Sequence, residues 1–131
     1  MSKTIVFVTN QYSCDRIICS ARTVADETSS ELLVVGILDS EYELNPEAID
    51  YLFLLSKQNK ATMRLLFTED KVSAMREAVG QYGCKAAVTG MPSSNQSVLY
   101  TLWKEFPGVA FYTVDLNGEI VEVAASHYCT A

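Results

Sequence analysis

Two patterns of hydrophobic and polar residues alternate along the chain. Five short segments are largely apolar on both faces and rich in β-branched residues: 3–9, 31–38, 61–67, 85–90 and 109–114. Such segments are typical of strands that are covered on both sides in a parallel sheet. Between them, apolar residues recur with helical period in four segments: 14–27, 46–59, 69–83 and 98–106. This alternation predicts right-handed βαβ units and an α/β fold with an open, doubly wound parallel sheet.

Residues that begin and end helices lie at the borders of these segments. Ser13 and Thr68 offer N-caps for the first and third helices, and Gly83 ends the third. The second helix opens at Pro46 and is more apolar than one sheet face requires. One of its faces carries Ile49, Leu52, Phe53 and Ser56.

The end of the chain predicts a hairpin. An Asn-Gly pair at 117–118 follows the fifth strand and is typical of a tight turn between antiparallel strands. Residues 119–124 are therefore expected to return as an antiparallel edge strand. Because the sequence shows no repeat, linker or low-complexity segment, residues 1–131 are predicted to form a single domain.

The composition and net charge limit the classes of partner that we expect. At 131 residues and 49% hydrophobic, the chain is the size of one domain with its own core. The chain has ten Lys and Arg residues and sixteen Asp and Glu residues, so it has no excess of positive charge to bind nucleic acid. We therefore expect no nucleic acid as a partner. The first apolar run is too short for a secretory signal or a membrane span, so we expect no membrane partner and a cytoplasmic location.

The cysteines and the histidine give little support for catalysis. Cys14, Cys19, Cys84 and Cys129 form neither a CxxC motif nor a Cys-His pair, and we expect reduced thiols that pack as small hydrophobic groups. His127 has no partner that its position indicates. With no Ser-His-Asp order, acid pair or metal-ligand spacing, the sequence predicts that the protein is not an enzyme and holds no metal.

Two segments of the sequence resemble the universal stress protein family. They are the strand, Ser-containing turn and helix of "TIVFVTNQYSCDRIICSARTVADE", and the acid-rich cap, helix, Gly and strand of "TEDKVSAMREAVGQYGCKAAVTG". The resemblance covers roughly residues 3–114. The sequence is also similar to the stress-protein-like domain of potassium-sensing histidine kinases. The resemblance implies a doubly wound five-stranded parallel sheet of order 3-2-1-4-5, here with the added antiparallel edge strand.

The family's ATP-binding pattern is incomplete in this chain. Nucleotide-binding members carry Gly-x2-Gly-x9-Gly-Ser/Thr after the fourth strand. Here Gly90 matches the first glycine, Ser93 stands at the second, and in an alignment without a gap Trp103 and Lys104 stand at the last two positions. A side chain at Ser93 restricts positive φ and Trp103 is far larger than glycine, so the usual phosphate cradle is predicted to be absent. No cofactor is expected, with ATP or AMP kept as candidates.

The fold also predicts where a ligand would bind. Open parallel sheets bind ligands at the carboxyl ends of the strands, where the strand order reverses, here between the first and fourth strands. The residues expected there are Thr9, Asn10, Gln11, Tyr12, Ser13, Asp39, Thr68, Gly90, Ser93, Ser94, Asn95 and Gln96. These mostly neutral groups suit a polar ligand or a nucleotide held by its base and sugar.

Nearby acidic residues weigh against a triphosphate at this place. The stretch "DSEYELNPEAID" adds five carboxylates, and only Lys71 or Lys104 is expected as a nearby cation. The same loops could equally be ordinary capped turns, because Ser and Asn satisfy helix ends in every fold.

Two functions of different classes therefore stay open. The first is a regulatory or binding module similar to universal stress proteins, acting as a homodimer that binds a small molecule or nucleotide. Its dimer surface would be the apolar helix at 46–59 or the edge of the fifth strand with its hairpin. The alternative is a small nucleotide-handling enzyme similar to the adenine-nucleotide α-hydrolase group. Those enzymes carry a Ser-Gly-Gly-x-Asp type of loop where this chain reads "TNQYSCD", so the first is preferred.

Overall fold

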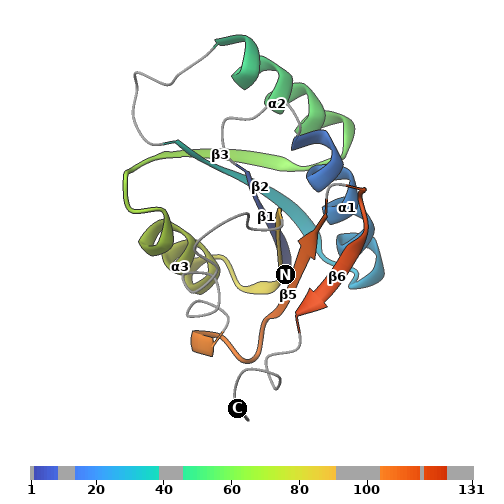
Figure 1. Cartoon of the computed structure of the whole chain (residues 1–131), viewed down its shortest axis with the longest axis vertical. Coiled ribbons are helices and arrows are strands. Elements are labelled where there is room, and N and C mark those ends of the chain that lie inside the picture. Colours follow the sequence, from blue (N-terminus) through green and yellow to red (C-terminus); the bar gives the residue numbers. More distant parts are fainter. Residues whose placement is uncertain (1, 9–13, 39–45, 91–103, 116, 124–131) are drawn as a thin grey trace.

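A single six-stranded sheet forms the centre of the molecule (Figure 1). The computed structural model describes residues 2–8, 14–38, 46–90, 104–115 and 117–123. The strands are β1 (Lys3–Val8), β2 (Glu31–Leu38), β3 (Thr62–Phe67), β4 (Cys84–Gly90), β5 (Ala110–Val114) and β6 (Ile120–Val123). Their order is β3-β2-β1-β4-β5-β6. Each of the pairs among β1 to β5 is parallel, whereas β6 runs antiparallel to β5. The predicted sheet, its strand order and its antiparallel edge strand are confirmed.

Helices cover both faces of this sheet. They are α1 (Cys14–Glu27), α2 (Pro46–Gln58) and α3 (Lys71–Gln81). On one face, side chains of α1 and α2 form a core with Val6, Val34 and Val88. On the other face, side chains of α3 pack with Ile5, Val35 and other residues of the sheet. Lys104 and Glu105 are helical, and Arg76 of α3 pairs with Glu105 through two hydrogen bonds of 2.6 and 2.9 Å. The segment leading into β5 therefore lies on the α3 side.

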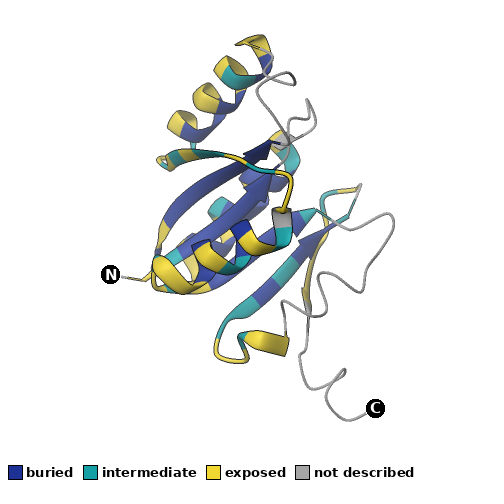
Figure 2. Cartoon of the chain, turned by 90° about the vertical axis from the view of Figure 1, so that its left-hand side faces the viewer, coloured by how far each residue is buried: buried dark blue, intermediate teal, exposed yellow. Residues whose placement is uncertain are grey.

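The central strands are buried on both faces because each face has its own helices. Residues 32–38 of β2 are all buried, and Ile5 and Val6 of β1 are 0% exposed (Figure 2). This explains the two-sided apolar pattern of these strands. The edge strand β3, in contrast, has no fully buried residue.

The third helix begins two residues later than predicted. Its N-cap is Asp70, whose carboxylate accepts hydrogen bonds from the backbone N–H and the hydroxyl of Ser73, at 3.1 and 2.8 Å. Thr68 prepares the turn, since its hydroxyl oxygen accepts the N–H of Asp70 at 3.1 Å. The prediction of Thr68 as the cap was wrong because a carboxylate at position 70 reaches the free amides of the first helical turn.

The second helix buries less of its apolar surface than its composition suggests. Its buried residues are Ala48, Leu52, Leu55 and Ser56. Phe53, which the sequence places on one face with Leu52 and Ser56, is 54% exposed, and Leu54 is 50% exposed. No helix in the described part of the chain is both long and apolar enough to cross a membrane.

The described cysteines differ in their environment. Cys19 on α1 is exposed, so the expectation that the thiols are buried was wrong for this residue. Cys84 is half-buried at the start of β4, and its thiol donates to the carbonyl of Ala86 at 3.1 Å. Burial raises the pKa of the Cys84 thiol to about 12. Both thiols are free.

This difference predicts selective alkylation of the folded protein. Because the thiolate is the reactive form, iodoacetamide at mildly alkaline pH should modify Cys19 and leave Cys84 unmodified until the protein is unfolded in urea. Mass spectrometry of the cysteine-containing peptides measures both rates in one sample. Equal rates of modification at Cys19 and Cys84 in the native protein would contradict the environment described for Cys84.

Candidate functional site

The strand order reverses between β1 and β4. From β1 the chain moves outward to β2 and β3 on one side, and from β4 it moves to β5 and β6 on the other. A parallel sheet offers its ligand position at this switch point, beyond the carboxyl ends of the two strands. In the described part of the chain, these ends are Val8 and Gly90.

Two of the candidate residues, Thr68 and Gly90, lie in the described part of the chain. The others fall outside it: Thr9, Asn10, Gln11, Tyr12, Ser13, Asp39, Ser93, Ser94, Asn95 and Gln96. Their assignment to the ligand position stays a prediction.

Gly90 is the last residue of β4 and lies against the start of α1. A Cβ built on Gly90 would be 3.0 Å from Cδ1 of Ile17. Gly90 thus allows the first turn of α1 to pack closely over the end of β4. The contact is with the end of a flexible side chain, so packing alone does not make glycine obligatory here.

Thr68 lies at a different part of the carboxyl edge. It follows β3, and its backbone N–H donates to the carbonyl of Leu38 at 2.8 Å. Because β2 and β1 lie between β3 and β4, three strand spacings put Thr68 at least about 14 Å from Gly90. A ligand in contact with Gly90 would have to extend at least this far to contact Thr68 as well.

A buried hydroxyl lies next to Gly90 and was not among the predicted residues. Thr89 is 6% exposed, and within the described structure its Oγ1 has no hydrogen-bond partner. It stands in register with Thr113 of β5, which is 5% exposed. Val88 belongs to the core under α1, so by strand alternation Thr89 faces the α3 side. The sequence signal was a polar residue next to the end of a mostly apolar strand.

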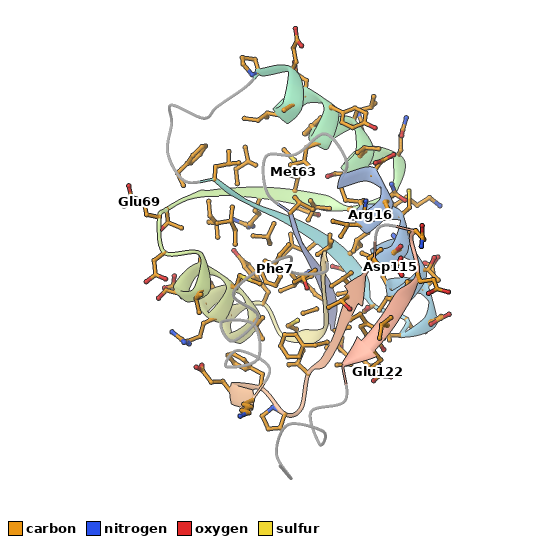
Figure 3. The ribbon with its side chains drawn as sticks, in the orientation of Figure 1. Phe7, Arg16, Met63, Glu69, Asp115 and Glu122 are labelled. Atoms are coloured by element: carbon orange, nitrogen blue, oxygen red, sulfur yellow. The ribbon has the colours of Figure 1, made fainter. Side chains whose placement is uncertain are left out.

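Arg16 is the second residue that the sequence analysis missed. It lies in the first turn of α1, and its side chain packs against the turn between β5 and β6, where a Cβ on Gly118 would be 3.7 Å from Arg16 Cγ. Gly118 has a φ of +84°, and the turn is closed by Asp115, whose carboxylate accepts the N–H groups of Asn117 and Glu119. Figure 3 labels Arg16 and Asp115.

The guanidinium of Arg16 is incompletely paired. Its Nε is buried and has no hydrogen-bond partner among the described residues. Arg16 immediately precedes Ile17, which contacts Gly90, whereas the Arg16 side chain itself packs at the turn that follows β5, the strand next to β4. Arg16 was not among the cations expected near this edge of the sheet, which were Lys71 and Lys104. Lys104 is exposed and adjoins Glu105 on the α3 side, and the Lys71 side chain lies outside the described structure.

Two further ionisable groups of the described structure have pKa values that their surroundings shift. Hydrogen bonds from Ser73 lower the pKa of Asp70. Burial raises the pKa of Tyr112, and the carboxylates of Glu122 and Glu27 raise it further. In the described part of the chain, no group of three or more His, Cys, Asp or Glu residues is placed to hold a metal ion.

Comparisons with known proteins identify the fold. No protein-family model matches the sequence, and no curated protein matches it. Among solved structures, the universal stress protein of Archaeoglobus fulgidus in complex with dAMP aligns with a TM-score of 0.59 and 13% identity, covering 88% of this chain and 97% of that one. A second structure of an Archaeoglobus fulgidus universal stress protein aligns with a TM-score of 0.55 and 13% identity, covering 74% of this chain and 81% of that one.

A bacterial structure gives the same result. A protein of the universal stress protein family from Burkholderia pseudomallei aligns with a TM-score of 0.57 and 14% identity, covering 87% of this chain and 94% of that one. These alignments cover 81 to 97% of the solved proteins. The chain has the fold of the universal stress proteins.

Proposed function

We propose that this protein is a regulatory module similar to universal stress proteins, which binds a small ligand without converting it and acts in the cytoplasm as a homodimer. The ligand position is the carboxyl edge between β1 and β4. The observation that carries this proposal is the buried Nε of Arg16, which has no hydrogen-bond partner among the described residues and belongs to the helical turn that packs over the end of β4, in a fold shared with a protein that was solved with dAMP.

The ligand class we propose is a nucleoside monophosphate held mainly by its base and sugar. Ser93 and Trp103 replace two glycines of the usual phosphate-binding pattern, so the backbone cradle for a triphosphate is missing from the sequence. The cation of Arg16, in the first turn of α1, suits one phosphate group. The hydroxyl and amide groups of the two loops would then contact the base and sugar.

A thermal-shift titration tests this proposal. The desalted protein is titrated with adenosine, AMP, dAMP, ADP and ATP, each with and without magnesium. A ligand present at one hundred times its dissociation constant adds about 2.7 kcal/mol to the stability of the folded state, and the melting temperature should rise by several degrees. We expect the monophosphates to stabilise the protein more than ATP does. No shift with any of these compounds would overturn the proposed ligand class.

The same samples separate binding from turnover. Chromatography of the nucleotides after incubation should return them unchanged. Conversion of a nucleotide at a rate proportional to protein concentration would instead support the alternative, an enzyme similar to the adenine-nucleotide α-hydrolases.

Substitution of Arg16 tests the role of the cation. In Arg16→Gln, the affinity for AMP should fall by about tenfold or more, because a charge-assisted hydrogen bond to phosphate contributes about 1.5 to 3 kcal/mol. The affinity for adenosine should change little, since adenosine has no phosphate. Isothermal titration calorimetry measures both affinities.

Two further variants serve as controls for this experiment. Arg16→Lys retains the charge and should retain part of the AMP affinity. Arg64→Gln removes an exposed cation of β3 that lies over the ring of Tyr82, and it should leave AMP binding unchanged. An equal loss for adenosine and AMP in Arg16→Gln would mean that Arg16 supports the local structure and does not contact phosphate.

A further inference from the structure

Helix α2 has two apolar sides, and only one of them is covered. The inner side packs on the sheet through Ala48, Leu52, Leu55 and Ser56. The outer side carries Phe53 and Leu54, which are 54% and 50% exposed near the middle of the helix. Two neighbouring large apolar side chains at this level of exposure are typical of a surface that another molecule covers.

One charged residue precedes these two side chains along the helix, and another follows them. Asp50 lies one turn before them and Lys57 one turn after them, and both are exposed. Residues 50, 53, 54 and 57 follow the i, i+3, i+4, i+7 spacing of a single helix face. We call these four residues the outer stripe. Within the described structure, neither Asp50 nor Lys57 forms an ion pair, so their charges are available to a partner.

The outer stripe is complementary to itself. When two copies of α2 cross antiparallel about a twofold axis, residue 53 faces residue 54 of the other copy, and residue 50 faces residue 57. The apolar side chains then cover one another at the centre. Asp50 meets Lys57 of the partner subunit on each side of the axis, because a twofold interface repeats every contact.

We propose that a second copy of this chain covers the outer stripe, with α2 packed antiparallel against α2 about a twofold axis. This inference rests on the homodimer in the proposed function and assigns its surface. The free edge of β6 fits a second copy less well. Its exposed apolar residues Ile120 and Val121 lie between Glu119 and Glu122, which are both exposed, so a pair of β6 strands would add carboxylates without matching cations.

Charge reversal on the outer stripe tests this assignment. In Asp50→Lys, and separately in Lys57→Glu, each of the two ion pairs across the axis becomes a repulsion, and dimerisation should weaken by about tenfold or more. The double variant Asp50→Lys/Lys57→Glu restores opposite charges across the axis and should regain most of the wild-type affinity. Sedimentation equilibrium over a dilution series measures each dissociation constant.

Mixing the two single variants tests directly whether residue 50 lies opposite residue 57 of the other subunit. A heterodimer of the Asp50→Lys chain with the Lys57→Glu chain has opposite charges at both contacts, so it should form at concentrations where each variant alone is monomeric. Native mass spectrometry distinguishes the heterodimer by mass. A subunit pairing that does not place residue 50 opposite residue 57 would not produce this rescue.

Two control variants match the changes in net charge on the other side of the sheet. Glu77→Lys on α3 and Lys104→Glu alter the same charges at exposed positions and should leave dimerisation unchanged. These substitutions, like those on the outer stripe, affect exposed side chains, so circular dichroism should show folded protein in every case.

The outcomes separate this inference from the proposed function. If the wild type dimerises and neither reversal weakens it, the dimer forms elsewhere and the assignment of the outer stripe is overturned, while the homodimer stands. If the wild type remains monomeric at every concentration, the homodimer and the outer-stripe interface are both overturned. The nucleotide titration is unaffected by either result, since it tests a site at the carboxyl edge of the sheet.

Discussion

Replacing Ile18 with alanine will lower the free energy of unfolding by about 2 to 5 kcal/mol. Ile18 is 0% exposed and lies on the inner side of α1, in the core that this helix forms with β1, β2 and β4. Alanine removes the apolar surface of the side chain from the core and leaves a cavity between the helix and the sheet. A domain of this size has a total stability of about 5 to 15 kcal/mol, so the variant would lose a large share of it.

Urea unfolding followed by circular dichroism measures this effect. Ile18→Val, which removes one methylene group, should cost about 0.5 to 1.5 kcal/mol. Cys19→Ala at the neighbouring exposed position should stay within about 0.5 kcal/mol of the wild type. If Ile18→Ala were no less stable than Cys19→Ala, the packing of α1 on the sheet would be wrong.

Replacing Gly36 with valine will also destabilise the protein, but through crowding. A Cβ on Gly36 of β2 would lie 2.9 Å from Cδ2 of Leu65 on β3 and 3.4 Å from Cδ2 of Leu52 on α2. Valine adds three carbon atoms at a point where the helix and the neighbouring strand already meet. Inserting extra carbon atoms into a packed core costs about 1 to 3 kcal/mol, and we expect a loss in this range.

A second substitution at Leu65 identifies the crowding as the cause. Leu65→Ala alone should destabilise the protein, because it removes a half-buried side chain. Combined with Gly36→Val, it opens the space that the valine needs. The double variant should therefore be more stable than the sum of the two single losses predicts, by about 0.5 kcal/mol or more. Strictly additive losses in urea unfolding would show that Leu65 does not oppose the added side chain.

The fold follows from local patterns to a large extent. The two-sided apolar strands, the helical periods between them and the Asn-Gly turn predicted the elements that the structure describes. The resemblance to universal stress proteins added the strand order. The cap of α3 was assigned incorrectly because Thr68 and Asp70 both favour helix starts, and only the positions of the backbone amides decide which one binds them.

The candidate site was predicted less completely. The sequence analysis selected polar residues in the loops after the strands, and of these the structure describes only Thr68 and Gly90. It missed Arg16 because a charged residue in the first turn of a helix has no pattern that reveals what its side chain contacts. The turn containing Gly118, against which Arg16 packs, is distant in the chain and approaches only when β5 and β6 have joined the sheet.

The sequence by itself determined the class of fold, because burial on both faces of a strand and on one face of a helix leaves a periodic trace in the residues. It also predicts that two positions of the usual phosphate-binding glycine pattern hold Ser93 and Trp103. Only the tertiary structure decided which apolar residues of α2 are covered and what the Arg16 side chain packs against. Both depend on how elements distant in the chain pack together, and such contacts are set by the three-dimensional arrangement of the sheet rather than by local periodicity.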